Sequence, residues 1–259
     1  MKIVQKQDII FALKDLGLAK GDIVLVHSSL SSFGYVEGGA DSVIDALMEV
    51  VGKDGGILMP SFSAFIGGEY GLVENNNIIF DLRVSPSAMG KITDEFWRKP
   101  GVRRSIHPTH PVAAWGARAL QVIRGHQNCL YSCGEGSPFH KNCLVGGKIL
   151  LIGVTHSCNT TLHTIEDVNG APTRSIFIYY PKVIDDEGRV ITVPTRPHLP
   201  GLPRRYQIMD DICKSEGIQI ETMVGKALLK LVMADKFFKL GSNLIKKDPV
   251  FLIDMNKMR

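Results

Sequence analysis

Length, composition and charge narrow the classes of protein to consider. With 259 residues, 44% of them apolar, the chain can bury a full hydrophobic core. No linker rich in Pro, Gly and Ser divides it, which favours a single domain that spans residues 1–259. A net charge of +4 is too small to indicate nucleic-acid binding, and no run approaches the roughly 20 apolar residues that a membrane span needs. We therefore expect a cytoplasmic protein that binds neither nucleic acid nor membranes.

The N-terminal third predicts a βαβ unit. Residues 5–16 have the pattern of an amphipathic helix, and charged residues interrupt any apolar run typical of a signal peptide. Residues 23–30 (IVLVHSSL) and 55–62 (GGILMPSF) each predict a buried strand. The segment between them predicts a helix that has Asp41 as its N-cap and ends at Gly52. Two strands joined by such a helix imply parallel pairing.

The rest of the chain predicts further strands and helices around the same sheet. In chain order these are a helix at 87–98, a strand at 148–154 (KILLIGV) followed by a helix, a hairpin of 175–184 and 189–193, helices at 204–216 and 222–240, and a last strand at 248–255. Together they predict an α/β fold, a single layered domain with a mixed, partly parallel sheet flanked by helices. Functional residues are then expected where strands end and helices begin.

His163 is the first candidate for a working residue. It lies in THSCNTTLHTIEDVNG (155–170), directly after the KILLIGV strand, where polar residues favour a helix start and Glu166 stands where a capping glutamate could follow. His163 and Glu166 are three residues apart, so they share one face of that helix. A histidine beside a carboxylate near a strand end has the geometry of a general base, although a histidine that only packs in a helix gives the same pattern.

A serine-rich segment follows the first predicted strand. In VHSSLSSFGYVEGGADS (26–42), four serines crowd the strand end and two glycines open the next helix. Small residues let backbone N–H groups approach a ligand, and a helix N-terminus favours an anion. The segment matches neither a Walker loop nor a dinucleotide-binding motif, so a phosphate cradle and a solvated turn are both open.

Histidines and cysteines gather in HQNCLYSCGEGSPFHKNC (126–143), which makes a structural zinc an alternative. The five cysteines of the chain are odd in number and unevenly spaced, which does not indicate a disulfide framework. Because the spacing within 126–143 fits no pair of C-x-x-C knuckles, ordinary reduced thiols are favoured over a zinc site.

Several motifs in a fixed order carry a family resemblance. They are HSSLSSFG followed by GGA, then GGILMPSFS, SPSAMGKI, GVRRSIHPTHPVAAWG, CGEGSP and LLIGVTHSCNTTLHTIED, with MVGKALL and KDPVFLID near the end. In this combination the chain resembles the aminoglycoside 3-N-acetyltransferases, the antibiotic N-acetyltransferase family, over nearly its whole length. The resemblance implies an α/β fold, acetyl-CoA as the acetyl donor, and a small-molecule amine acceptor on an aminoglycoside or a related aminosugar.

The resemblance also assigns roles to residues. His163 would match the catalytic histidine of the family and Glu166 the acid beside it in LHxxE. His163 would take the amine proton in a direct transfer without an acyl-enzyme, and Glu166 would orient the ring and raise its pKa. The residues expected to line the coenzyme are His27, Ser28, Ser29, Leu30 and Ser31 in the HSSL segment, with Ser105 and His107 in SIHP.

Two positions depart from the family pattern. Family members often carry Asp where this chain has Ser157, and Ser where it has Pro111. Because aminoglycosides are polycations that need several carboxylates, a missing acid predicts a narrow or atypical acceptor range. The acids that remain available for the acceptor are Glu69, Glu74, Asp81, Glu135 and Asp167.

Three functional hypotheses remain at this point. The main one is acetyl-CoA-dependent N-acetylation of an aminoglycoside, with no metal ligand assigned. A second is the N-acetylation of a biosynthetic aminosugar that is not an antibiotic. The third, from another class, is a zinc-binding interaction module built on the 126–143 cluster (His126 to Cys143) without catalytic activity.

Overall fold

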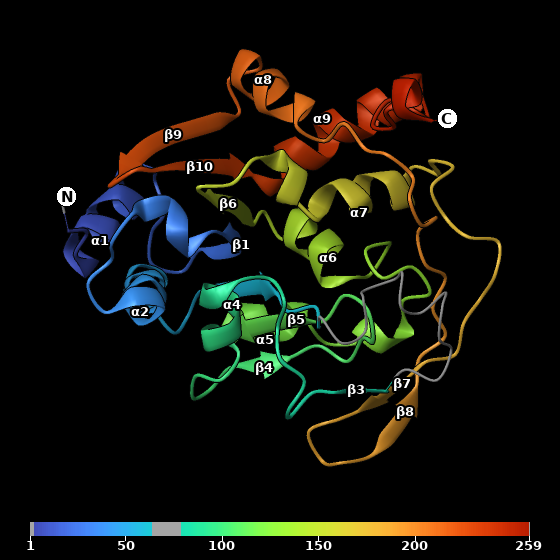
Figure 1. Cartoon of the computed structure of the whole chain (residues 1–259), viewed down its shortest axis with the longest axis horizontal. Coiled ribbons are helices and arrows are strands. Elements are labelled where there is room, and N and C mark those ends of the chain that lie inside the picture. The colour runs from blue at the N-terminus through green and yellow to red at the C-terminus, as the bar shows by residue number, and fades with distance from the viewer. Residues whose placement is uncertain (1–2, 64–78, 259) are drawn as a thin grey trace.

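A mixed sheet of seven strands forms the centre of the computed structural model, which describes residues 3–63 and 79–258 (Figure 1). The strands, in their order across the sheet, are β4 (Arg103–Arg104), β5 (Val112–Trp115), β2 (Gly56–Pro60), β1 (Ile23–Ser28), β6 (Lys148–Ile152), β10 (Ala227–Met233) and β9 (Gln219–Val224). β2, β1 and β6 are parallel, and the remaining neighbours pair antiparallel. The predicted fold class, with a partly parallel sheet flanked by helices, is confirmed.

Helices cover both faces of this sheet because its central strands are apolar on both sides. The α-helices of the described residues are α1 (Lys6–Asp15), α2 (Gly39–Val51), α4 (Lys91–Phe96), α5 (Ala117–Val122), α6 (Pro138–Leu144), α7 (Thr161–Val168), α8 (Ile208–Ser215) and α9 (Ala234–Lys247). Within these described residues, no helix combines the length and the apolar character needed to cross a bilayer.

Alternate residues of β1 and β6 face the two helical layers. Val24 of β1 and Leu150 of β6 belong to one core with residues of α1, α2 and α4. On the opposite face, Leu25 packs with residues of α5 and α6, and Leu151 packs with residues of α7, α8 and α9. Figure 1 shows α1 and α2 on one side of β1 and β6, and α6 and α7 on the other.

A smaller sheet lies beside the main one at the bottom right of Figure 1. In it, β3 (Ile79–Asp81) pairs parallel with β7 (Lys182–Ile184), which forms an antiparallel hairpin with β8 (Val190–Thr192). The predicted hairpin is therefore confirmed, with shorter strands. Arg104 joins the two sheets, because its guanidinium donates to the carbonyl oxygens of Ser61 after β2 and of Leu82 and Ser85 after β3.

The prediction of a helix at 222–240 is wrong for its first half. Residues 219–233 form the β9–β10 hairpin, with Gly225 and Lys226 between the strands, and α9 begins only at Ala234. Gly225 has φ +59, and a Cβ atom there would lie 2.5 Å from the Phe33 carbonyl oxygen. Leucine-rich β10 is buried on both faces, so it lacks the alternation that distinguishes a strand from a helix.

Other boundaries also differ from prediction. α2 begins at Gly39, two residues before the predicted N-cap Asp41. The predicted helix at 204–216 begins only at Ile208, which leaves residues 204–207 outside it. The predicted last strand at 248–255 is reduced to one bridge between Arg204 and Ile253. β5 was not predicted, because four residues with two alanines give little strand signal.

Candidate active site

The carboxyl ends of the three parallel strands meet at one edge of the main sheet. β2 leads into residues 61–63, β1 into residues 28–33 and β6 into residues 153–160. The segments that follow β1 and β6 approach each other closely at Gly153. This residue has φ +63, and a Cβ atom there would lie 1.8 Å from Ser32 Oγ. This edge brings together the serine-rich segment and the start of the helix that carries His163.

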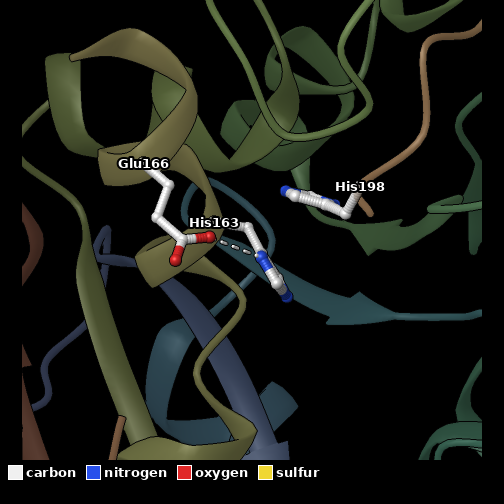
Figure 2. Close-up of side chains that lie close together, drawn as sticks. All are labelled: His163, Glu166 and His198. Carbon is white, nitrogen blue, oxygen red and sulfur yellow. Dashed lines mark hydrogen bonds and ion pairs between the residues drawn. The ribbon is translucent and has the colours of Figure 1, made fainter. Parts of the chain in front are cut away.

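His163 and Glu166 lie together on α7. His163 Nδ1 is 3.2 Å from Glu166 Oε2, and the other ring nitrogen points away from the carboxylate (Figure 2). The Glu166 side chain is 1% exposed and that of His163 is 25% exposed, so the acid is buried and the ring reaches solvent. Glu166 does not cap the helix as predicted; instead, Asn159 Oδ1 accepts the N–H of Thr161.

Two residues of a distant segment also hold the Glu166 carboxylate. Tyr206 donates its hydroxyl hydrogen to Glu166 Oε2 over 2.7 Å and lies 2.9 Å from His163 Nδ1. Arg204 Nε donates to Glu166 Oε1 over 3.2 Å. Burial alone would raise the pKa of Glu166, but His163 and Arg204 outweigh it and lower that pKa to about 2. The carboxylate is therefore charged at neutral pH.

Burial is the main reason why the pKa of His163 is lowered from its ordinary value. The positive form of His198 acts in the same direction, since the two ring centroids are 4.1 Å apart. Glu166 opposes this shift without reversing it. The prediction that the carboxylate raises the pKa of His163 above its usual value is therefore wrong. Near pH 7 the ring is neutral, which is the form that accepts a proton.

Two further histidines border the ring of His163. His198 Nε2 lies 3.4 Å from Asp167 Oδ1, and Asp167 is also paired with Arg174. The ring centroid of His110 is 6.3 Å from those of both His163 and His198. The site thus contains three neighbouring imidazoles, of which His163 is the one paired with the charged Glu166.

His163, Glu166 and His198 also place candidate ligand atoms within 4.8 Å of one another, the one group of three or more metal-ligating side chains found among residues 3–63 and 79–258. The Glu166 oxygens are already bonded to Arg204 and Tyr206. A cation bound there would compete with the Arg204 guanidinium and the Tyr206 hydroxyl for the carboxylate, so the arrangement suits proton transfer better than metal binding.

A small pocket opens beside the His163 ring. It has a volume of about 160 Å³ and is lined by Phe62, His110, residues 157–160, His163 and Tyr206. A larger cavity, of about 620 Å³, lies between β4 and the β7–β8 turn and reaches neither His163 nor Glu166. The smaller pocket is therefore the one of the two that adjoins the His163 ring.

The first group of predicted coenzyme residues lies at the same sheet edge. Ser28 Oγ is buried and has no hydrogen-bond partner in the described part of the chain. The hydroxyls of Ser29 and Ser31 are 3.1 Å apart, and Ser31 is exposed. His27 is buried at the end of β1, and Leu30 packs against the core. Ser29 and Ser31 therefore offer hydroxyls that a polar ligand could reach, whereas the Ser28 hydroxyl is out of solvent.

Ser105 and His107 lie inside the protein. Ser105 Oγ is 2.8 Å from His126 Nδ1, and the His107 ring is stacked on that of His126 with a centroid distance of 4.5 Å. The side chains are 2% and 0% exposed, so they support the segment that carries His110. Contact between either residue and the coenzyme stays a prediction.

The side chains of residues 126–143 do not converge on a metal. Both ring nitrogens of His126 are engaged, one with Ser105 and one with a backbone carbonyl. Cys129 and Cys143 donate to carbonyl oxygens, and burial raises the pKa of both thiols, that of Cys143 to about 12. Because zinc binds the thiolate, the geometry does not favour the zinc-binding module.

We expect the protein to lose stability in mild acid because of its buried neutral histidines. Burial lowers the pKa of both His27 and His126 to about 3, whereas in the unfolded chain each stays near 6.5. The unfolded state then binds more protons between pH 6.5 and 3, so stability is complete above pH 6.5 and falls as the pH falls through this window. From pH 7 to 5 the loss is about 2 kcal/mol for each histidine.

Urea unfolding at pH 7 and pH 5 measures this loss. His126→Gln keeps a donor and an acceptor but does not titrate, so it should reduce the difference by about 2 kcal/mol. An equal free energy of unfolding at both pH values in the unmodified protein would contradict the account.

The described acids that were expected to serve the acceptor do not line the pocket. Glu69 and Glu74 lie outside the described residues. Asp167 is buried in its pair with Arg174, Asp81 is bound by Arg83, and Glu135 is exposed. Among the described residues no carboxylate lines the pocket, whereas Ser157 does.

Four side chains of the site were missed by sequence reasoning. His110 lies in the RRSIHPTHP segment, where a histidine before a proline more often has a structural role. Nothing in the sequence therefore indicated that His110 lies near His163. Arg204 and Tyr206 were placed inside a predicted helix, and His198 follows the hairpin without a motif. Only the folded chain brings these residues to α7.

Comparison with known proteins identifies the family. Residues 25–246 match the family model described as aminoglycoside 3-N-acetyltransferase. The chain belongs to the aminoglycoside 3-N-acetyltransferase family. It is thus a member of an acyltransferase family, as its motifs predicted.

Two curated relatives support this membership. Aminoglycoside N(3)-acetyltransferase IV of Salmonella sp is 30% identical over 255 residues, which cover 96% of this chain and 90% of that protein. The SPbeta prophage-derived aminoglycoside N(3')-acetyltransferase-like protein YokD of Bacillus subtilis (strain 168) is 37% identical over 175 residues. That match covers 62% of this chain and 64% of YokD, which is less than two thirds of its length.

Solved structures of the family share the fold. Aminoglycoside acetyltransferase AAC(3)-IVa, solved as a histidine-to-alanine variant in complex with a gentamicin, superposes with a TM-score of 0.82 at 29% identity, over 97% of this chain and 92% of that one. AAC-IIIb, solved as a binary complex with CoASH, gives a TM-score of 0.82 at 24% identity, over 95% and 98% of the two chains. Because its identity is only 24%, the similarity to AAC-IIIb supports the fold alone.

Proposed function

We propose that this chain is an acetyl-CoA-dependent N-acetyltransferase that acts on an amino group of an aminoglycoside or a related aminosugar, with His163 as its general base. The observation that carries the proposal is the neutral His163 ring, placed between the charged Glu166 carboxylate and a pocket at the sheet edge. Family membership supports acyl transfer. The gentamicin complex of AAC(3)-IVa supports the acceptor class, and membership of an N-acetyltransferase family supports acetyl-CoA as the donor.

The chemistry requires a proton acceptor next to the acceptor amine. The amine nitrogen attacks the thioester carbonyl, a C–N bond forms, the C–S bond breaks, and the coenzyme leaves as its thiol. The nitrogen must give up a proton before or during this attack, and the His163 ring nitrogen that faces away from Glu166 is placed to accept it. Glu166 stabilises the imidazolium that forms. The proton can then pass to the departing sulfur.

Transfer is direct in this proposal, because none of the described residues that line the pocket is an activated nucleophile. Cys158 is the cysteine that lines it; the residue is exposed, but partial desolvation of the thiol still raises its pKa. A protonated thiol is a poor nucleophile. The coenzyme would lie along the segment that follows β1, where Ser29 and Ser31 offer hydroxyls.

Release of the coenzyme thiol tests the function. The protein is incubated with acetyl-CoA and a panel of aminoglycosides and simple monoamino sugars, and free thiol is measured against time. We expect release that depends on the acceptor, with a mass gain of one acetyl group on it. Turnover of monoamino sugars alone would favour the biosynthetic alternative. No release with any acceptor, together with no coenzyme binding, would contradict the proposal.

Ser157→Asp is expected to strengthen binding of polycationic acceptors. Ser157 lines the pocket and is exposed, so a carboxylate there would meet the cation in a solvated place and contribute about 1 kcal/mol or less, up to about fivefold in affinity. The KM for gentamicin should fall at low salt, and the gain should shrink as ionic strength rises. Ser157→Asn is the uncharged control. A gain in Ser157→Asn equal to that in Ser157→Asp would show that charge is not the cause.

A further inference from the structure

Residues 204–206 approach α7 from a part of the chain that is fixed elsewhere. Arg204 forms a bridge with Ile253. Arg205 is held through its backbone N–H and its Nε by the carbonyl oxygens of residues 251–252, over 3.0 and 2.6 Å. The segment is therefore anchored on the C-terminal part of the chain, and its side chains reach Glu166 from a support independent of α7.

The hydroxyl of Tyr206 lies between the imidazole and the carboxylate. Its distances are 2.9 Å to His163 Nδ1 and 2.7 Å to Glu166 Oε2, whereas Nδ1 and Oε2 are 3.2 Å apart. The direct contact is at the long end of the range for an N–H···O hydrogen bond, so the hydroxyl is the closer partner of both groups. Tyr206 is only 5% exposed, so water does not compete for it.

Counting hydrogens assigns the tautomer of His163. A tyrosine hydroxyl has one hydrogen, and it goes to the charged Glu166, the stronger acceptor. The Tyr206 oxygen then faces His163 Nδ1 with a lone pair, and Glu166 Oε2 faces the same nitrogen with another. Because both neighbours accept, Nδ1 must carry the hydrogen of the neutral ring. Nε2 is then unprotonated.

We propose that Tyr206 is a positioning residue, whose hydroxyl fixes His163 in the tautomer with a bare Nε2 at the acceptor pocket. The assignment of Nε2 as the base rests on the proposed function, whereas the tautomer is a property of the resting protein. Burial raises the pKa of Tyr206 well above its usual value, so the hydroxyl keeps its hydrogen at the pH values where the enzyme would work. Arg204 completes the arrangement by holding the second oxygen of Glu166.

Tyr206→Phe removes this link and keeps the ring of the side chain. Nδ1 is left with the longer contact to Glu166 alone, so a second tautomer, with its hydrogen on Nε2, becomes populated. We expect kcat to fall about 10-fold, the size of one lost hydrogen bond, with the KM for acetyl-CoA unchanged. Without the Tyr206 hydrogen, Oε2 faces the ring unshielded, so the acid limb of the pH profile moves to higher pH.

The test combines nitrogen NMR of the His163 ring with kinetics. Ring signals are assigned by their loss in His163→Gln and recorded for the unmodified protein, Tyr206→Phe and the control Tyr180→Phe, whose residue is 56% exposed and lies outside the site. We expect one tautomer, protonated at Nδ1, in the unmodified protein and the control, and a mixture in Tyr206→Phe. A hydrogen on Nε2 in the unmodified protein would overturn the proposal without any variant, and so would an unchanged tautomer and kcat in Tyr206→Phe. Absent acetyl transfer would refute the function and leave the tautomer result standing.

Discussion

Replacing His163 with alanine is expected to lower kcat by about 10²–10⁴-fold while the affinity for acetyl-CoA stays nearly unchanged. The imidazole is the neutral base that borders the pocket and is paired with the charged Glu166. Coenzyme binding is expected at the segment after β1, which the substitution does not touch. Steady-state thiol release and the coenzyme-induced rise in Tm, measured on the same variant, separate the two effects.

The alternative is that His163 only packs α7 in place. Under that alternative, alanine would lower stability and turnover together; because the side chain is partly exposed, we expect Tm to fall by no more than a few degrees while turnover is largely lost. His140→Ala is a matched control, since His140 packs against Phe238 outside the pocket and should keep its kcat. A folded His163→Ala protein that retains most of its turnover rules out the base. Glu166→Gln should cost less than His163→Ala, because the base remains.

Ser29→Trp is expected to abolish the rise in Tm that saturating acetyl-CoA produces. Binding at 100 times Kd stabilises a protein by about 2.7 kcal/mol, which makes the rise easy to measure. Ser29 follows β1 directly, and its N–H is bonded to the Ile152 carbonyl, so an indole there would occupy the space in front of the strand ends. The same indole would block access of the coenzyme to the hydroxyl of Ser31.

The controls for this variant concern folding and position. Without coenzyme, Ser29→Trp should melt within a few degrees of the unmodified protein. Ser215→Trp places the same indole on an exposed position at the end of α8 and should leave the coenzyme effect intact. A full rise in Tm for Ser29→Trp would place the coenzyme elsewhere.

Much of the fold could be predicted because local patterns decide it. β1, α2 and β2 follow from two apolar runs and an amphipathic segment with glycine at both ends, and the parallel pairing follows from the helix between the strands. β10 could not be predicted in this way. Its run ALLKLVM suits a helix by composition, and only its place between β6 and β9 makes it a strand.

The candidate site also contains contacts that the sequence predicts and contacts that depend on the tertiary structure. His163 and Glu166 could be paired from sequence because three residues within a helix bring two side chains together. Arg204 and Tyr206 reach the same carboxylate from 38 and 40 residues away, through an anchor at the C-terminal end that no local pattern encodes. The direction of the His163 pKa shift was missed for the same reason, because burial and His198 are tertiary effects.

The measurement that tests the central claim most directly is the pH dependence of kcat/KM for one good acceptor, in the unmodified protein and in His163→Ala. Because the pKa of His163 is lowered, the account predicts an acid limb with an apparent pKa below 6.5. At neutral pH the ring is then unprotonated, and kcat/KM is not reduced by protonation of His163. The limb should be absent from the small residual activity of His163→Ala. The same limb in both proteins would show that another group takes the proton, and the assignment of His163 as the base would be wrong.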